Sequence, residues 1–110
     1  MTFDEYQQQA LTTALYTDDE MTNLAISALG VAGEAGEVAD KMKKVLAYDR
    51  GVMTEEIRAE FGKELGDVLW YVAVMAQQLG MPLDSIAQKN LDKLASRKER
   101  GVTRGNGDNR

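Results

Sequence analysis

The sequence predicts an all-α protein whose four helices form a bundle-like arrangement. Apolar residues recur at spacings of three and four along most of the chain, which is the period of an amphipathic helix. Only one proline and two phenylalanines are present, and β-branched residues are scattered, so helix is favoured over strand. With 110 residues, 44% of them apolar and 28% charged, the composition is that of one globular domain.

The first two predicted helices are separated by a short polar segment. A capping box at Thr2 and Glu5 starts the first helix, which is expected to run to about Tyr16. Residues 17–20 are polar and break the pattern. The second helix is expected over residues 22–47, where apolar side chains follow a helical period.

Three glycines interrupt the second predicted helix at intervals of three residues, at Gly30, Gly33 and Gly36. Each costs about 1 kcal/mol relative to alanine in a helix interior. The glycines either allow another helix to pack closely or leave room for a ligand beside Glu34 and Glu37, and both can hold. A kink in the helix is a further alternative.

The third and fourth predicted helices have clear start and stop signals. Thr54 is a good N-cap for the third helix, which runs to Leu79 and ends at Gly80. Pro82 begins the fourth helix, which is expected to continue to about Arg100.

The chain is expected to consist of one domain, residues 1–100, and a flexible tail, residues 101–110. The tail contains three glycines and two asparagines. No signal peptide, transit peptide or apolar run of membrane-spanning length is recognisable. A cytoplasmic protein with no membrane partner is therefore expected.

The residue types that are missing restrict the possible chemistry. The chain has no cysteine and no histidine, which excludes disulfides, thiolate metal sites, cysteine nucleophiles and histidine-based triads. Acid–base chemistry must come from carboxylate, lysine, tyrosine or metal-bound water. The formal net charge of −5 argues against binding to nucleic acid, which is itself a polyanion.

Two acidic pairs are the strongest candidates for a functional site: Glu34 with Glu37, and Glu64 with Asp67. Residues i and i+3 share one face of a helix, so antiparallel packing of the two helices would bring four carboxylates together. Such a cluster calls for a cation, and oxygen ligands suit Mg²⁺ or Mn²⁺ better than zinc. The alternative is ordinary surface charge, although the second pair is flanked directly by core residues.

A basic set on the fourth predicted helix complements these acids. Lys93 and Arg97 lie four residues apart on one face, and Asn90 precedes them by three. The two cations could bind phosphate groups. They could equally be charges placed near a helix C-terminus, where the helix dipole favours them.

Taken together, these patterns resemble a known family. The order is Glu-x-x-Glu, a gap of 26 residues, Glu-x-x-Asp, and then Asn-x-x-Lys-x-x-x-Arg. Over residues 2–100 it resembles the MazG-like branch of the all-α nucleoside triphosphate pyrophosphohydrolases, short phage and bacterial type. The local strings Gly-Glu-Ala-Gly-Glu-Val and Glu-Leu-Gly-Asp-Val-Leu-Trp carry the same likeness.

The resemblance implies hydrolysis of a nucleoside triphosphate between its α and β phosphates, giving a monophosphate and pyrophosphate. It assigns the metal ligands to Glu34, Glu37, Glu64 and Asp67, which would hold one or more Mg²⁺ ions, with Mn²⁺ as a possible substitute. Either Glu34 or Glu37 would also be catalytic, accepting the proton of the attacking water.

The resemblance also implies a set of substrate-binding residues. Lys93 and Arg97 would neutralise phosphate charge, and Asn90 would hydrogen-bond to phosphate or sugar. Tyr71 matches a position that contacts the nucleotide in some relatives, and otherwise it is a half-buried aromatic residue. The tail is either disordered or a lid that brings Arg104 or Arg110 to the phosphates.

One four-helix unit leaves little wall around a nucleotide, so a homodimer or homotetramer is expected, with the site near the interface. Two alternatives to a general nucleoside triphosphate substrate stay open. The same site could act on an alarmone or on dUTP or dCTP alone. The chain could also be a non-catalytic helical interaction module whose acids only increase solubility.

Overall fold

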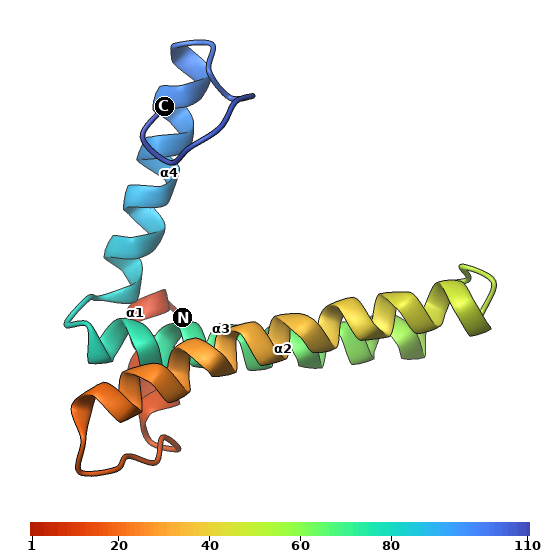
Figure 1. Cartoon of the computed structure of the whole chain (residues 1–110), viewed down its shortest axis with the longest axis horizontal. Coiled ribbons are helices and arrows are strands. Elements are labelled where there is room, and N and C mark those ends of the chain that lie inside the picture. The colour runs from red at the N-terminus through yellow and green to blue at the C-terminus, as the bar shows by residue number, and fades with distance from the viewer.

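The structure is a computed structural model of residues 1–110, and it contains four helices and no strand. The helices are α1 (Phe3–Leu11), α2 (Glu20–Tyr48), α3 (Glu55–Gln78) and α4 (Leu83–Glu99). The predicted all-α class and helix number are thus confirmed. Figure 1 shows α2 and α3 lying side by side as a long antiparallel hairpin, with α1 near its open end and α4 projecting away.

Side chains cap the first and third helices as the sequence predicts. Thr2 and Glu5 form the capping box of α1, and the Thr54 side chain accepts a hydrogen bond from the backbone of Ile57 at the start of α3. Gly80, with φ of +72°, ends α3, because glycine adopts this left-handed conformation without steric cost.

The end of the first helix differs from the prediction. It was expected near Tyr16, but α1 ends at Leu11. The hydroxyl groups of Thr12 and Thr13 donate hydrogen bonds to the carbonyls of Gln9 and Ala10. Threonine hydroxyls that bond the local backbone compete with continued helix formation. The other helix boundaries agree with prediction to within about two residues, which is the usual uncertainty of helix ends.

The buried core is small and lies where α1, α3 and α4 meet. Its apolar centre consists of Ala10, Ala73, Ala76 and Leu83. The buried side chain of Gln7 joins the three helices at this point.

Gln7 determines how α4 leaves the core. Its amide donates hydrogen bonds to the carbonyls of Ala73 and Met81, and its oxygen accepts one from the backbone N–H of Leu83. The Asp4 carboxylate accepts a second hydrogen bond from the start of α4. These α1 side chains satisfy N–H groups that a helix N-terminus leaves unpaired, and so they fix the direction of α4.

The helices do not close into a bundle within one chain, which corrects the bundle-like part of the prediction. α4 packs against α1 and the end of α3 but not against α2. The accessible surface is 8091 Å², whereas a compact monomer of 12.1 kDa has about 6,000 Å². The radius of gyration is 16.9 Å, against about 13 Å for a compact domain of this length. No helix combines the length and the apolar character that crossing a membrane requires.

Candidate metal centre

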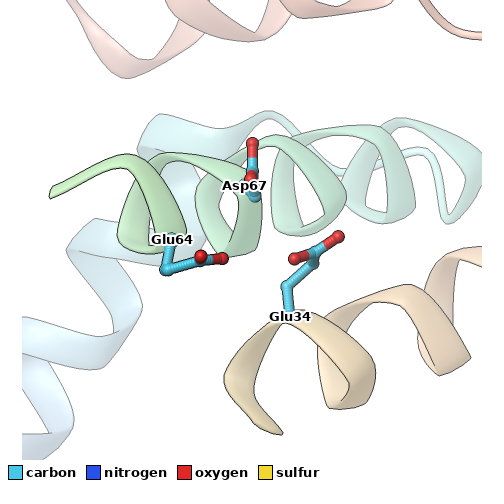
Figure 2. A group of neighbouring side chains, drawn as sticks. All are labelled: Glu34, Glu64 and Asp67. Carbon is cyan, nitrogen blue, oxygen red and sulfur yellow. The ribbon is translucent and has the colours of Figure 1, made fainter. Parts of the chain in front are cut away.

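Antiparallel packing of α2 and α3 brings three of the four predicted metal ligands together. One carboxylate oxygen from each of Glu34, Glu64 and Asp67 lies within 4.8 Å of the others. Figure 2 shows Glu34 reaching from α2 towards α3, where Glu64 points back into the space between the helices. One member of the first acidic pair, Glu34, therefore faces both members of the second.

Glu37, the fourth predicted ligand, is exposed and lies outside this group of three. It is nevertheless close enough to influence Glu34. Partial burial raises the pKa of Glu34 above its ordinary value, and the negative charges of Asp67, Glu64 and Glu37 raise it further. The neighbouring carboxylates thus disfavour the charged form of Glu34, and a cation bound among them would oppose this effect.

Lys41 contacts the site in a way that its position in the sequence does not predict. It lies one turn after Glu37, a spacing that favours an ion pair on the same helix over contact with a phosphate. In the structure the Lys41 ammonium instead crosses to α3, 3.4 Å from a Glu64 oxygen and 3.8 Å from one of Glu60. The pairing is between helices, and no spacing within one helix could have revealed it. Lys41 places one positive charge at the edge of the carboxylate group.

One of the three glycines of α2 has the close-packing role considered for it, whereas room for a ligand stays a prediction. A Cβ added to Gly30 would lie 2.3 Å from the ring of Tyr71, so this glycine allows α3 to pack closely. A Cβ added to Gly33 or Gly36 would have no neighbour within 4 Å. The surface of α2 at these two glycines is therefore open. Tyr71 lies one turn beyond Asp67, against α2.

The predicted phosphate-binding pair is already engaged by an acid of the tail. The Lys93 ammonium lies 2.7 Å from an Asp108 carboxylate oxygen, and an Arg97 nitrogen lies 3.2 Å from the same oxygen. These cations lower the pKa of Asp108. Arg97 is buried, and its Nε atom has no hydrogen-bond partner. Asn90 is exposed on the same helix.

The tail folds back along the far end of α4 (Figure 1). Arg110, one of the two residues proposed for a lid, donates hydrogen bonds to the carbonyls of Val102, Thr103 and Gly107 within the tail itself. The flexibility of residues 101–110 stays a prediction.

The structure therefore contains two separate parts of the predicted site. The acidic part lies between α2 and α3, and the basic part lies on α4, which makes no contact with α2. Within one chain these two parts are not brought together. The acidic part offers only carboxylate oxygens, and this donor set fits a hard divalent cation such as Mg²⁺ or Mn²⁺.

The chain is all-helical, and its two longest helices face each other with carboxylates. The comparison with known families agrees with the resemblance that the sequence shows. The chain belongs to the MazG nucleotide pyrophosphohydrolase domain family, whose model matches residues 22–102. It is 48% identical to the Gene 37 protein of Mycobacterium phage L5, over 114 aligned positions that cover all of both chains. No solved structure matches the chain significantly.

Proposed function

We propose that the protein hydrolyses (deoxy)nucleoside triphosphates between the α and β phosphates, with Mg²⁺ as the cofactor. The products are a nucleoside monophosphate and pyrophosphate. The observation that carries this proposal is the group of three carboxylates contributed by two helices, in a chain of the MazG family. Mn²⁺ has similar ligand preferences and is expected to substitute for Mg²⁺.

In this proposal the acidic residues have two roles. Glu34, Glu64 and Asp67 hold the metal, which when bound polarises the phosphate and lowers the pKa of a bound water. Glu37 lies on α2 with Glu34 but outside the group of three. Because it is not needed as a metal ligand, its carboxylate can accept the proton of the attacking water. Glu34 is the alternative base. Lys41 lies close enough to the group to balance part of the phosphate charge.

Lys93 and Arg97 are proposed to bind the phosphate groups, with Asn90 and Tyr71 completing the contacts to the nucleotide. Asp108 holds the two cations in the structure, so a phosphate must displace its carboxylate to reach them. A phosphate offers more oxygens than a single carboxylate contact does, and it could also satisfy the unpaired Arg97 Nε.

We further propose that the protein functions as a homodimer or homotetramer. The chain exposes about 2,000 Å² more than a compact monomer of its mass. That is the scale of an obligate interface. Large apolar side chains are exposed on α2 and α4, including Leu29, Leu46, Leu91 and Leu94. In an assembly of copies, α4 of one chain can approach the carboxylates of another, which would join the two parts of the site.

A nucleotide screen tests the proposed reaction. Each of the common ribo- and deoxyribonucleoside triphosphates, with an alarmone added to the set, is incubated with Mg²⁺ or Mn²⁺, and pyrophosphate and inorganic phosphate are measured separately. Pyrophosphate release that chelation or Glu64→Gln abolishes is the expected result. Release of phosphate alone would place the cleavage elsewhere, and no release from any nucleotide would favour an interaction module.

A further inference from the structure

Lys41 is held between α2 and α3 beside the metal centre, unlike the lysine that follows it two residues later. The Lys41 side chain is 28% exposed, and its ammonium lies 3.4 Å from a Glu64 oxygen and 3.8 Å from a Glu60 oxygen. Lys43 is 67% exposed and pairs with Asp40 on its own helix at 2.8 Å. Lys41 therefore belongs to the surroundings of the carboxylates, whereas Lys43 lies on the solvent side of α2.

The metal centre has different neighbours on its two sides along the α2–α3 hairpin. Toward the open end of the hairpin (Figure 1), α3 carries no acidic residue after Asp67, and the next contact is Tyr71 against Gly30. Toward the loop that joins the two helices, Lys41 lies against Glu60. A further carboxylate of α3 is thus present on one side alone, and a lysine ammonium already lies there.

A second divalent ion would have to bind on the side that Lys41 holds. Enzymes that act on phosphates with two metal ions keep the ions about 3.5–4 Å apart, so the second ion also needs ligands close to the first. In this chain the Lys41 ammonium is in contact with Glu64, and Glu60 is paired with Lys63 at 2.9 Å. A second ion would therefore meet two positive charges where it needs free carboxylates.

The charges around the centre match one divalent ion. The carboxylates of Glu34, Glu64 and Asp67 carry a formal charge of −3, and the Lys41 ammonium reduces it to −2. One Mg²⁺ or Mn²⁺ ion neutralises the remainder. The Glu64 side chain is only 17% exposed, so solvent screens its contact with Lys41 less than it screens a pair on the open surface.

The Lys41 ammonium also keeps hydrogen-bonding capacity for a ligand. An ammonium group has three N–H donors. The contacts of Lys41 with Glu64 and Glu60 are 3.4 and 3.8 Å long, whereas N–H···O hydrogen bonds are usually about 2.7–3.2 Å long. The donors can therefore bind an oxygen of a phosphate group and neutralise its charge, as a second cation does in two-metal enzymes.

We propose that Lys41 takes the place of a second metal ion, so that each site combines one divalent ion with one fixed ammonium. The inference rests on the proposed nucleotide hydrolysis and adds to it the number of metal ions and the role of Lys41. The three carboxylates bind the ion, and Lys41 donates to a phosphate oxygen on the side nearer the loop between α2 and α3.

Counting bound Mn²⁺ ions tests this inference without depending on catalysis. The full-length protein is titrated with Mn²⁺ alone, and electron paramagnetic resonance measures the free ion. Wild type is expected to bind one ion per chain. Lys41→Gln should bind the first ion about fivefold more tightly, because a unit charge a few ångströms away no longer repels it. The variant should also take up a second ion at higher Mn²⁺ concentration.

Two further variants separate the charge of Lys41 from its contribution to packing. Lys41→Arg keeps a positive charge and should bind one ion with about the wild-type affinity. Lys43→Gln makes the same change of charge two residues away, where the lysine pairs with Asp40, and it should also bind like wild type. If Lys41 served only to tie α2 to α3, Lys41→Gln would lower the urea midpoint and leave Mn²⁺ binding unchanged.

The rate of pyrophosphate release connects the number of ions to the reaction. Lys41→Gln should lower kcat by at least about tenfold at low Mg²⁺, since it removes a group that stabilises charge on the phosphate. Part of that loss should be recovered at high Mg²⁺, where a second ion takes the place of the ammonium. A loss of kcat that no Mg²⁺ concentration reduces would contradict this role.

The outcomes separate this inference from the reaction itself. If wild type binds two Mn²⁺ ions per chain, or if Lys41→Gln keeps the wild-type number and affinity, the inference is wrong even when pyrophosphate is released. If wild type binds no Mn²⁺, the inference fails together with the metal centre. If no nucleotide releases pyrophosphate, the proposed reaction fails. In that event, one Mn²⁺ ion in wild type and two in Lys41→Gln would still support Lys41 as the replacement for a second ion.

Discussion

The contact between Gly30 and Tyr71 gives a sharp test of how α2 and α3 are held together beside the metal centre. Gly30→Ala adds one methyl group whose carbon would lie 2.3 Å from the Tyr71 ring. No real contact is that short, so the ring must move, and it would then lose its edge-to-face packing against Trp70.

The expected change in the free energy of unfolding combines two costs and one gain. Overpacking of this kind costs about 1–3 kcal/mol. Loss of the aromatic pair costs about 0.5–1.5 kcal/mol. Alanine gains about 1 kcal/mol over glycine in a helix. We therefore expect Gly30→Ala to lower the free energy of unfolding by about 2 kcal/mol.

Gly33→Ala is the matched control, because a Cβ at this position meets nothing within 4 Å and only the gain in helix propensity remains. It should raise the free energy of unfolding by about 1 kcal/mol at most. Urea unfolding of both variants and wild type, at one protein concentration and followed by circular dichroism, measures these changes. A Gly30→Ala variant as stable as Gly33→Ala would refute the close packing of Tyr71 on α2.

Three further predictions concern charge and polar contacts. Burial and neighbouring carboxylates raise the pKa of Glu34 above 4.5, so the metal-free folded state binds this proton more tightly than the unfolded state, and stability is lost as pH rises through that raised value. In metal-free urea titrations, Glu34→Gln should therefore be more stable than wild type at pH 7 and differ little from it at pH 4. An equal difference in stability at the two pH values would contradict this cause. Asp108→Asn removes a largely exposed carboxylate that pairs with Lys93 and Arg97, so calorimetry should show inorganic tripolyphosphate binding up to about fivefold tighter, and weaker binding would show that Asp108 does not compete. Gln7→Leu removes three hydrogen bonds that join α1, α3 and α4 and should lower the free energy of unfolding by about 3 kcal/mol in the same urea assay, whereas an unchanged midpoint would show that these bonds do not hold α4.

Local sequence signals predicted the four helices and the facing of Glu34 with the second acidic pair. Caps at Thr2 and Thr54 and the stop at Gly80 are short-range signals, and they appear where expected. The facing of Glu34 with Glu64 follows from spacing once two long helices pack antiparallel. The early end of α1 was not predicted, because a pattern of apolar positions does not show the hydrogen bonds that the Thr12 and Thr13 hydroxyls make to the local backbone.

Contacts between distant segments could not be predicted from spacing. The α4 direction depends on Gln7, which reaches groups more than 60 residues away in the chain. The Lys41 contact with Glu64 and the Asp108 contact with Lys93 are likewise long-range pairings. The helical spacing of apolar residues places Leu65 on the core face of α3, yet it is 58% exposed, since the four helices do not close into a bundle within one chain.

The central claim is that carboxylates from two different helices form one divalent metal site. Its most direct test is Mn²⁺ binding, followed by electron paramagnetic resonance, for wild type, Glu34→Gln, Glu64→Gln and the control Glu56→Gln. Loss of either ligand should weaken Mn²⁺ binding by about tenfold or more, since even outer partners of a metal site contribute about that much. Glu56, in the first turn of α3, lies outside the group, and its variant should bind like wild type. Equal Mn²⁺ affinity in all four proteins would contradict a metal centre shared by α2 and α3.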